Sequence, residues 1–123
     1  MRLNMDVPVQ LTHALLPQLH KAPRAYLLNI ASATAYSSIA TLAVYGGSKA
    51  FVLRWSRALG VELKGTGITV TCACPGSVNT GFIARAGMQS MEAIASKVSM
   101  EAEPVAQACV RAMLNGKAEV VPG

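Results

Sequence analysis

Charged residues are scarce in this chain of 123 residues. They make up only 14% of it, whereas hydrophobic residues make up 52%. An ordinary soluble domain contains about 25% charged residues. A chain of this length forms at most one domain, which is large enough to bury a core. The low charge therefore indicates large interfaces, or a piece of a larger fold.

Features that define several other classes of protein are missing. No apolar run reaches the roughly 18 residues of a membrane span, and MRLNMDVPVQ lacks the apolar core of a signal peptide. We therefore expect no membrane association and a cytoplasmic location. The positive residues are scattered, without a basic run or interleaved aromatic residues, so the net charge of +5 does not favour nucleic-acid binding.

The cysteines follow neither a metal-binding nor a disulfide pattern. Cys72, Cys74 and Cys109 are odd in number and lack the paired spacing of metal ligands. Cys72 and Cys74 alternate along an apolar stretch, so they share one face of the expected strand. We expect buried, reduced thiols in a reducing compartment, and no metal site.

Apolar periodicity predicts an alternation of helices and strands. Helices are expected over residues 7–20, 44–64 and 101–116, with a short helix over 88–98. Apolar or β-branched runs predict strands over 26–31 and 68–74, and a third strand begins near residue 117. Gly65 is placed to end the second helix. This alternation is typical of parallel βαβ units, so we predict an α/β fold whose sheet is covered on both faces.

Tyr45 and Lys49 stand four residues apart in TLAVYGGSKAFVLRWSRAL, on one face of the expected helix. The pKa of a free tyrosine is about 10 and must fall by about 3 for the phenol to act as a base near neutral pH. An ammonium group at about 4 Å supplies on the order of 4 kcal/mol at an effective dielectric constant near 20. Lys49 is therefore sufficient in principle to make the Tyr45 phenol reactive.

Ser32 follows the strand YLLNIA, at the edge where open α/β sheets bind their ligands. Its neutral hydroxyl can hold a reacting oxygen without competing for the proton. Taken singly, the three residues have ordinary alternatives: a rim tyrosine, a solvated lysine and a turn serine. Together, in this order, Ser32, Tyr45 and Lys49 indicate a proton-transfer site.

Three motifs in register resemble the short-chain dehydrogenases/reductases. LLNIAS, Tyr45-Gly-Gly-Ser-Lys49 and CACPGSVNTGF correspond to N-[IV]-x-S, Y-x-x-x-K and P-G-x-V-x-T of that family. The resemblance implies an NAD(P)-dependent oxidoreductase, which transfers hydride between nicotinamide and a carbonyl or secondary alcohol. It implies that Tyr45 donates or accepts the proton, Ser32 holds the substrate oxygen, and Lys49 lowers the tyrosine pKa and binds the nicotinamide ribose. The residues implied to line the nicotinamide are Pro75, Gly76, Val78 and Thr80.

The family often adds an asparagine in the preceding helix, and Asn4 in LNMDVPVQ is the candidate. Pro8 has no N–H, so a helix that extends back to residue 4 leaves the Asn4 carbonyl without its helical partner. That carbonyl could hold a water and pass protons from Lys49 to solvent. The alternative is that Asn4 caps a helix that begins near Asp6.

The resemblance covers nearly the whole chain but only the second half of the family's domain. It implies a single partial domain over residues 1–123: a partial doubly wound, Rossmann-like parallel sheet in three αβα layers, without the N-terminal dinucleotide-binding strands. The glycine-rich T-G-x-x-x-G-x-G turn and the residue that selects NAD or NADP are missing. The cofactor is thus NAD or NADP, and we expect this chain alone to bind it weakly or not at all.

The family commonly dimerises or tetramerises through helices that correspond to residues 7–20 and 44–64, which implies a homo-oligomer. A small apolar carbonyl or alcohol substrate is suggested by the residues expected around its pocket, Ala33, Ala35, Phe82, Ile83 and Met88. The alternative function is a truncated, non-catalytic remnant that binds a full-length relative through its helices.

Overall fold

A computed structural model describes residues 2–36, 40, 43–76, 78–79 and 100–122 of the chain. The first half contains η1 (Arg2–Asp6), α1 (Val7–Lys21), β1 (Ala25–Ile30), η2 (Ala33–Tyr36) and α2 (Ala43–Glu62). The second half contains β2 (Ile68–Ala73), β3 (Val78–Asn79), β4 (Met100–Glu101), α5 (Ala102–Leu114) and β5 (Glu119–Val120). The short helix expected over residues 88–98 lies outside the described residues.

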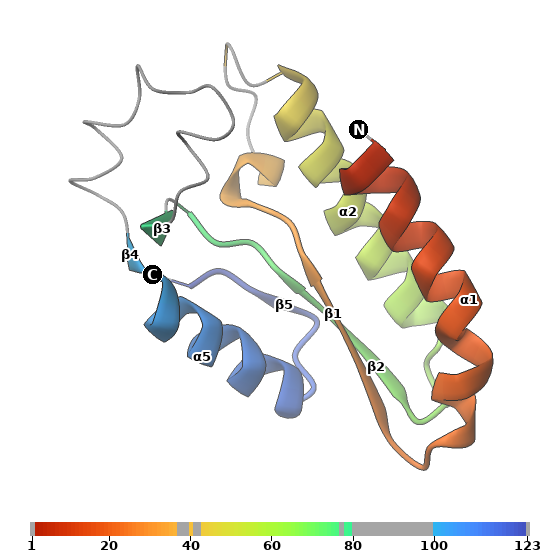
Figure 1. Cartoon of the computed structure of the whole chain (residues 1–123). Helices are drawn as coiled ribbons and strands as arrows, with labels where there is room; N and C mark the ends of the chain where they lie inside the picture. The colour runs from red at the N-terminus through yellow and green to blue at the C-terminus, as the bar shows by residue number, and fades with distance from the viewer. Residues whose placement is uncertain (1, 37–39, 41–42, 77, 80–99, 123) are drawn as a thin grey trace.

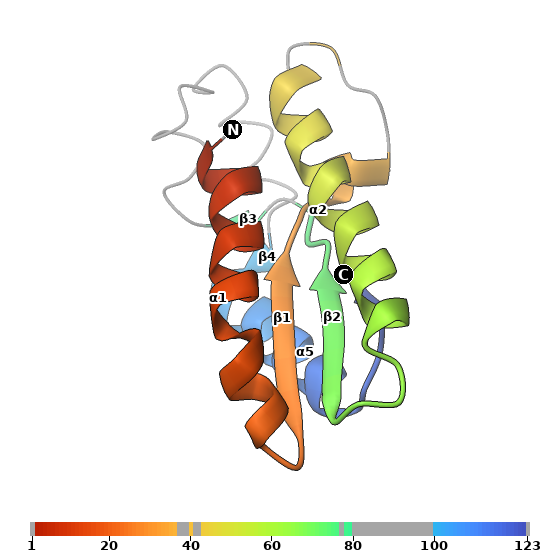
Figure 2. The ribbon, with the colours of Figure 1, turned by 90° about the vertical axis from the view of Figure 1, so that its right-hand side faces the viewer.

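The main sheet is parallel and has the strand order β1-β2-β5. β1 and β2 pair along their whole length, from Ala25 opposite Ile68 to Ile30 opposite Ala73. Helices α1 and α2 cover one face of this sheet and α5 covers the other (Figures 1 and 2). This arrangement confirms the predicted α/β class and the three-layer, Rossmann-like parallel sheet.

The helix and strand boundaries lie close to the predicted ones. Gly65 follows α2 with a φ of +89°, the left-handed conformation that glycine adopts easily, so it ends the helix as predicted. Gly67 precedes β2, and a Cβ added there would collide with the carbonyl oxygen of Pro23. The short parallel pair of β3 and β4 was not predicted.

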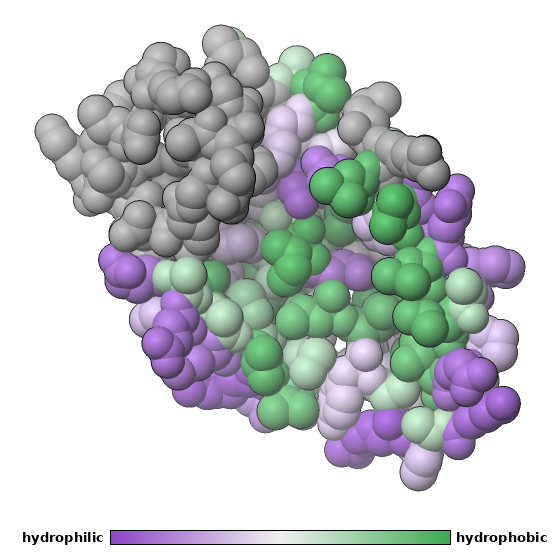
Figure 3. Space-filling model, in the orientation of Figure 1, coloured by the Kyte–Doolittle hydropathy of each residue, from purple (hydrophilic) through white to green (hydrophobic). Residues whose placement is uncertain are grey.

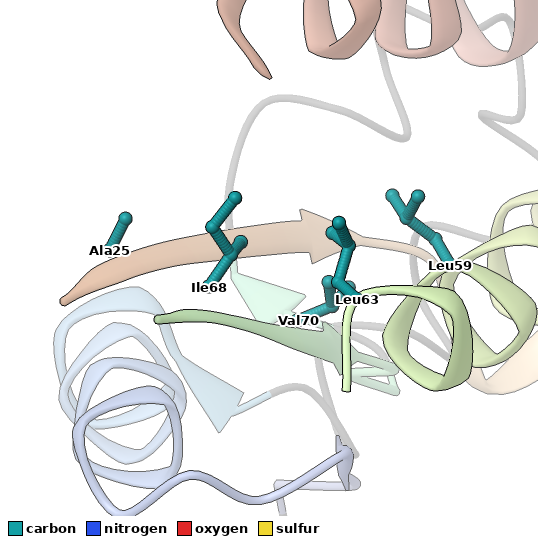
Figure 4. Close-up of a cluster of buried hydrophobic side chains, with 5 residues drawn as sticks. All are labelled: Ala25, Leu59, Leu63, Ile68 and Val70. Carbon is teal, nitrogen blue, oxygen red and sulfur yellow. The ribbon is translucent and has the colours of Figure 1, made fainter. Parts of the chain in front are cut away.

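The core lies between the sheet and its helices. One buried cluster joins β1, β2 and the end of α2, and consists of Ala25, Leu59, Leu63, Ile68 and Val70 (Figure 4). A second cluster, nearer the carboxyl ends of the strands, contains Ala31, Val52, Leu53, Cys72 and Cys74. All three cysteines are buried and free, which confirms the prediction of buried thiols.

Glu119 connects β5 to both neighbouring elements. Its carboxylate accepts a hydrogen bond from the Tyr36 hydroxyl at 2.8 Å and forms an ion pair with Arg57 of α2. Both partners of the ion pair are partly exposed, so it contributes little to stability.

Much apolar surface is exposed. Within the described part of the chain, β1 has a strand partner on one side only. In the view of Figure 1, β1 runs through the centre of the molecule. Figure 3, in the same orientation, shows a broad apolar area there, between α1 and α5. This exposure agrees with the low charge of the sequence. No helix among the described residues combines the length and apolarity needed to cross a bilayer.

Candidate active site

The predicted site residues meet at the carboxyl edge of the sheet. Ser32 follows β1, Pro75 and Gly76 follow β2, and Tyr45 and Lys49 lie in the first turns of α2. Backbone hydrogen bonds join the two strand ends, from Ala31 N to Ala73 O at 2.7 Å and from Ala33 N to Pro75 O at 2.9 Å. The two chain segments that leave the sheet here are therefore fixed relative to each other.

Tyr45 and Ser32 interact through their side chains. Burial raises the pKa of the half-buried Tyr45, and a hydrogen bond with Ser32 lowers it by a smaller amount. A bond that lowers this pKa stabilises the phenolate, so Ser32 acts as the donor to the phenol oxygen. The backbone N–H of Thr34 donates to Ser32 Oγ at 3.2 Å, which leaves the hydroxyl hydrogen of Ser32 for that role.

Lys49 lies on the same face of α2 as Tyr45, as predicted. Its Nζ is 5.7 Å from the centre of the Tyr45 ring and donates to the Ile30 carbonyl at 3.2 Å. Burial lowers the pKa of Lys49.

Burial, rather than Lys49, is the largest influence on the pKa of Tyr45. We expected the ammonium to lower the tyrosine pKa, but the pKa is raised because burial is the dominant influence. The ammonium packs near the ring and bonds to Ile30. The geometry of the pair was thus predicted correctly, but burial sets the direction of the Tyr45 pKa shift, and the effect of Lys49 on it stays a prediction.

Asn4 belongs to η1, a π-helical turn directly before α1, in which Pro8 occupies one of the first two positions. The helical backbone therefore does extend back to residue 4, as the prediction about the Asn4 carbonyl required. The Asn4 side chain does not cap α1, because its Nδ2 donates to Ser48 Oγ at 3.2 Å. The position before α1 is Asp6, which makes no side-chain capping bond.

Ser48 contacts two of the predicted site residues and was not itself predicted. It is 2% exposed, and its Oγ donates to the Tyr45 carbonyl at 2.7 Å while accepting the bond from Asn4. A serine inside a helix commonly bonds to a carbonyl one turn earlier. Its position three residues after Tyr45 could have indicated this bond to the Tyr45 carbonyl.

The structure describes part of the expected nicotinamide site. Pro75 and Gly76 lie at the carboxyl edge, and a Cβ added to Gly76 would meet nothing within 4 Å. Val78 lies in β3, whose backbone pairs with β4. Thr80 lies outside the described residues, as do Phe82, Ile83 and Met88 of the expected substrate pocket. The other two pocket residues, Ala33 and Ala35, are half-buried in η2.

The residues that are described fit one end of a nicotinamide cofactor. An ammonium group has three N–H donors, and the bond from Lys49 to Ile30 uses one of them. The Thr34 hydroxyl is buried next to Gly46 and has no hydrogen-bond partner within the described residues. The same residues contain no group of three or more His, Cys, Asp or Glu side chains suited to a metal ion.

Comparison with known proteins agrees with the resemblance that the motifs indicated. Residues 1–90 match the family model described as short chain dehydrogenase. Ketoacyl reductase HetN from Nostoc sp. is 32% identical over 121 residues, which are 96% of this chain and 40% of that protein. Very-long-chain 3-oxoacyl-CoA reductase from Coprinopsis cinerea is 38% identical over 81 residues, 66% of this chain and 22% of that protein.

The fold also matches solved structures. A short-chain dehydrogenase from Sphingobium yanoikuyae in complex with NADPH superposes with a TM-score of 0.85 at 25% identity, over 98% of this chain and 46% of that one. The chain thus spans less than half the length of these three relatives. Because the family model matches most of the sequence and the fold agrees, the chain belongs to the short-chain dehydrogenase family.

Proposed function

We propose that this chain carries the proton-transfer site of an NAD(P)-dependent oxidoreductase that interconverts a carbonyl compound and an alcohol. The observation that supports this most is the meeting of Ser32, Tyr45 and Lys49 at the carboxyl edge of the sheet. The names of two relatives, a ketoacyl reductase and a 3-oxoacyl-CoA reductase, support carbonyl chemistry.

Tyr45 is the proton donor to the carbonyl oxygen. Because burial raises its pKa, the phenol keeps its proton at neutral pH, which suits the direction of reduction. Ser32 donates a hydrogen bond to the same oxygen and holds it within reach of the phenol. A general acid placed in this way contributes typically 10²- to 10⁴-fold to a rate.

Lys49 has two roles in this proposal. Its remaining N–H donors bind the ribose hydroxyls of the cofactor, and its positive charge favours release of the Tyr45 proton. Pro75, Gly76, Val78 and Thr80 line the nicotinamide, which supplies the hydride when bound. The proposal covers both NAD and NADP.

The Asn4 carbonyl holds a water through which protons pass between Lys49 and solvent. This carbonyl belongs to the π turn before Pro8, where an ordinary helical partner is missing. A water held there returns protons to Lys49 and Tyr45 after each turnover. The substrate is a small apolar carbonyl compound, which Ala33 and Ala35 of η2 contact.

The test is carbonyl-dependent consumption of a reduced nicotinamide, supplied at millimolar concentration as NADPH or as reduced nicotinamide mononucleotide. The mononucleotide needs no adenosine site, and the proposed residues contact only the nicotinamide and its ribose, so we expect turnover with both. We expect Tyr45→Phe to lower the rate by about 10² or more, because the proton donor is lost. The matched control is Tyr26→Phe, at the opposite end of β1, which should keep the wild-type rate. Equal rates for wild type and Tyr45→Phe would overturn the proposal.

A second candidate function is a non-catalytic module that binds another protein chain. It is favoured by the one-sided pairing of β1 and by the apolar area beside it (Figure 3). The same assay separates the two functions. Consumption that depends on both the carbonyl compound and Tyr45 favours the enzyme, whereas its absence with both cofactors favours the binding module.

A further inference from the structure

Ser48 connects two residues of the proposed site that are distant in sequence. Its Oγ accepts a hydrogen bond from Asn4 Nδ2, 44 residues away, and donates one to the Tyr45 carbonyl within the same helix. The hydroxyl has a single hydrogen, which the Tyr45 carbonyl receives. The oxygen lone pairs of Ser48 are therefore left for Asn4.

This contact is partly buried, and the Ser48 side of it is deeply buried. Ser48 is 2% exposed and lies where η1 contacts α2. Removing one partner of a buried hydrogen bond costs the desolvation of the other. If the Ser48 hydroxyl were absent, the Asn4 amide would have to turn to solvent, and η1 would lose this polar attachment to α2.

We propose that Ser48 is a positioning residue, which holds the Asn4 side chain against the helical turn that carries Tyr45 and Lys49. Asn4 lies in a π turn, a rare form of helix that is frequent at functional sites. The bond to Ser48 fixes this turn relative to the phenol and the ammonium. The importance of that placement for proton transfer rests on the proposed function, but the placement itself does not.

The same helix contains a matched control. Asn29 Nδ2 donates to Ser56 Oγ at 2.9 Å, and Ser56 is 3% exposed. Ser56 follows Tyr45 by 11 residues, which is about 16 Å along a helix. The two serines therefore share residue type, helix, burial and partner type, and only Ser48 touches the proposed site.

The test is the rate at which the Asn4 side-chain amide hydrogens exchange with water, measured by ¹⁵N NMR on the full chain. In Ser48→Ala we expect the slower of the two hydrogens to exchange about 10-fold faster or more, because its acceptor is gone. Ser48→Thr keeps the acceptor and should keep the wild-type rate. Ser56→Ala should speed exchange at Asn29 and leave Asn4 unchanged.

Two outcomes would overturn the proposal: unchanged Asn4 exchange in Ser48→Ala, or equal acceleration of Asn4 exchange in Ser56→Ala. If Ser48→Ala does not fold, Ser48→Cys provides the test, since a thiol has nearly the same size and is a weak acceptor. The readout does not depend on turnover. Failure of the Tyr45→Phe assay and failure of the Ser48 proposal are therefore separate results.

Discussion

Tyr45 and Lys49 are both held in surroundings that disfavour their charged forms. Burial raises the pKa of the phenol and lowers the pKa of the ammonium, so each shift opposes ionisation. Such shifts cluster at functional sites, where burial and neighbouring groups adjust titratable residues to their chemistry. The hydrogen bond from Ser32 is the influence that opposes burial at Tyr45.

The first prediction concerns this hydrogen bond. Ser32→Ala should raise the pKa of Tyr45 further, because the donor that stabilises the phenolate is removed. The measurement is an alkaline titration followed by ¹³C NMR of the tyrosine ζ carbons, which distinguishes the three tyrosines. Ser56→Ala is the control and should leave Tyr45 unchanged. A lower Tyr45 pKa in Ser32→Ala would contradict the assignment of Ser32 as donor.

The raised pKa of Tyr45 also affects stability. The unfolded chain releases the Tyr45 proton near pH 10, whereas the folded chain still retains it at that pH. The free energy of unfolding should therefore fall as the pH rises above about 10. Tyr45→Phe should make this fall less steep in urea titrations at a series of pH values, and Tyr26→Phe serves as the matched substitution.

The helices and strands were largely predictable, because apolar periodicity and turn residues set them locally. The predicted helices over 7–20 and 44–64 correspond to α1 and α2, and the strand over 68–74 corresponds to β2. The π turn at η1 was not predicted; the missing N–H of Pro8 indicated only that the Asn4 carbonyl would lack its usual helical partner. The β3–β4 pair was not predicted, because two-residue strands carry no periodic signal.

The site was less predictable than the fold, since its chemistry depends on burial and on contacts between distant segments. The sequence indicated Ser32, Tyr45 and Lys49 through their spacing along one strand and one helix. It did not indicate that Lys49 bonds to Ile30, or that burial outweighs the positive charge at Tyr45. Ser48 was missed because its partner Asn4 lies in a different element.

Substitution of two glycines tests the close contact between the start of β2 and the turn before β1. Gly67→Ala should lower the free energy of unfolding by about 1–3 kcal/mol, because the added methyl group collides with the Pro23 backbone where the chain enters β2. Gly47→Ala in α2 meets nothing within 4 Å and should raise it by about 0.5–1 kcal/mol through helix propensity. Urea unfolding measures both. If Gly67→Ala proved as stable as wild type, this tight contact between β2 and the turn before β1 would not be present.

At the scale of the whole molecule, the exposed apolar surface is typical of a protein–protein interface. Val7, Leu11 and Leu15 are 37%, 56% and 43% exposed and repeat every four residues along α1. This spacing places them on one face of the helix. We propose that a homo-oligomer forms through α1 and α2, as helices of this family commonly do.

Self-association gives the prediction at this scale. The wild-type chain should elute with a mass above that of the monomer in size-exclusion chromatography with light scattering. Leu11→Glu should shift it toward the monomer, because a charge would be buried in the interface. Leu114→Glu on α5 is the control, since Leu114 is also 56% exposed. An interface elsewhere would be indicated if Leu11→Glu had no effect or if only Leu114→Glu dissociated the oligomer.

The central claim is that this site joins proton donation by Tyr45 to reduction of a carbonyl group. The most direct measurement uses reduced nicotinamide mononucleotide with both C4 hydrogens replaced by deuterium and an apolar ketone, with the alcohol product analysed by mass spectrometry. The account predicts one deuterium on the carbinol carbon with the wild-type chain and with Tyr26→Phe, and about 10²-fold less labelled product with Tyr45→Phe. Unlabelled product with the wild-type chain, or equal labelling with Tyr45→Phe, would contradict it.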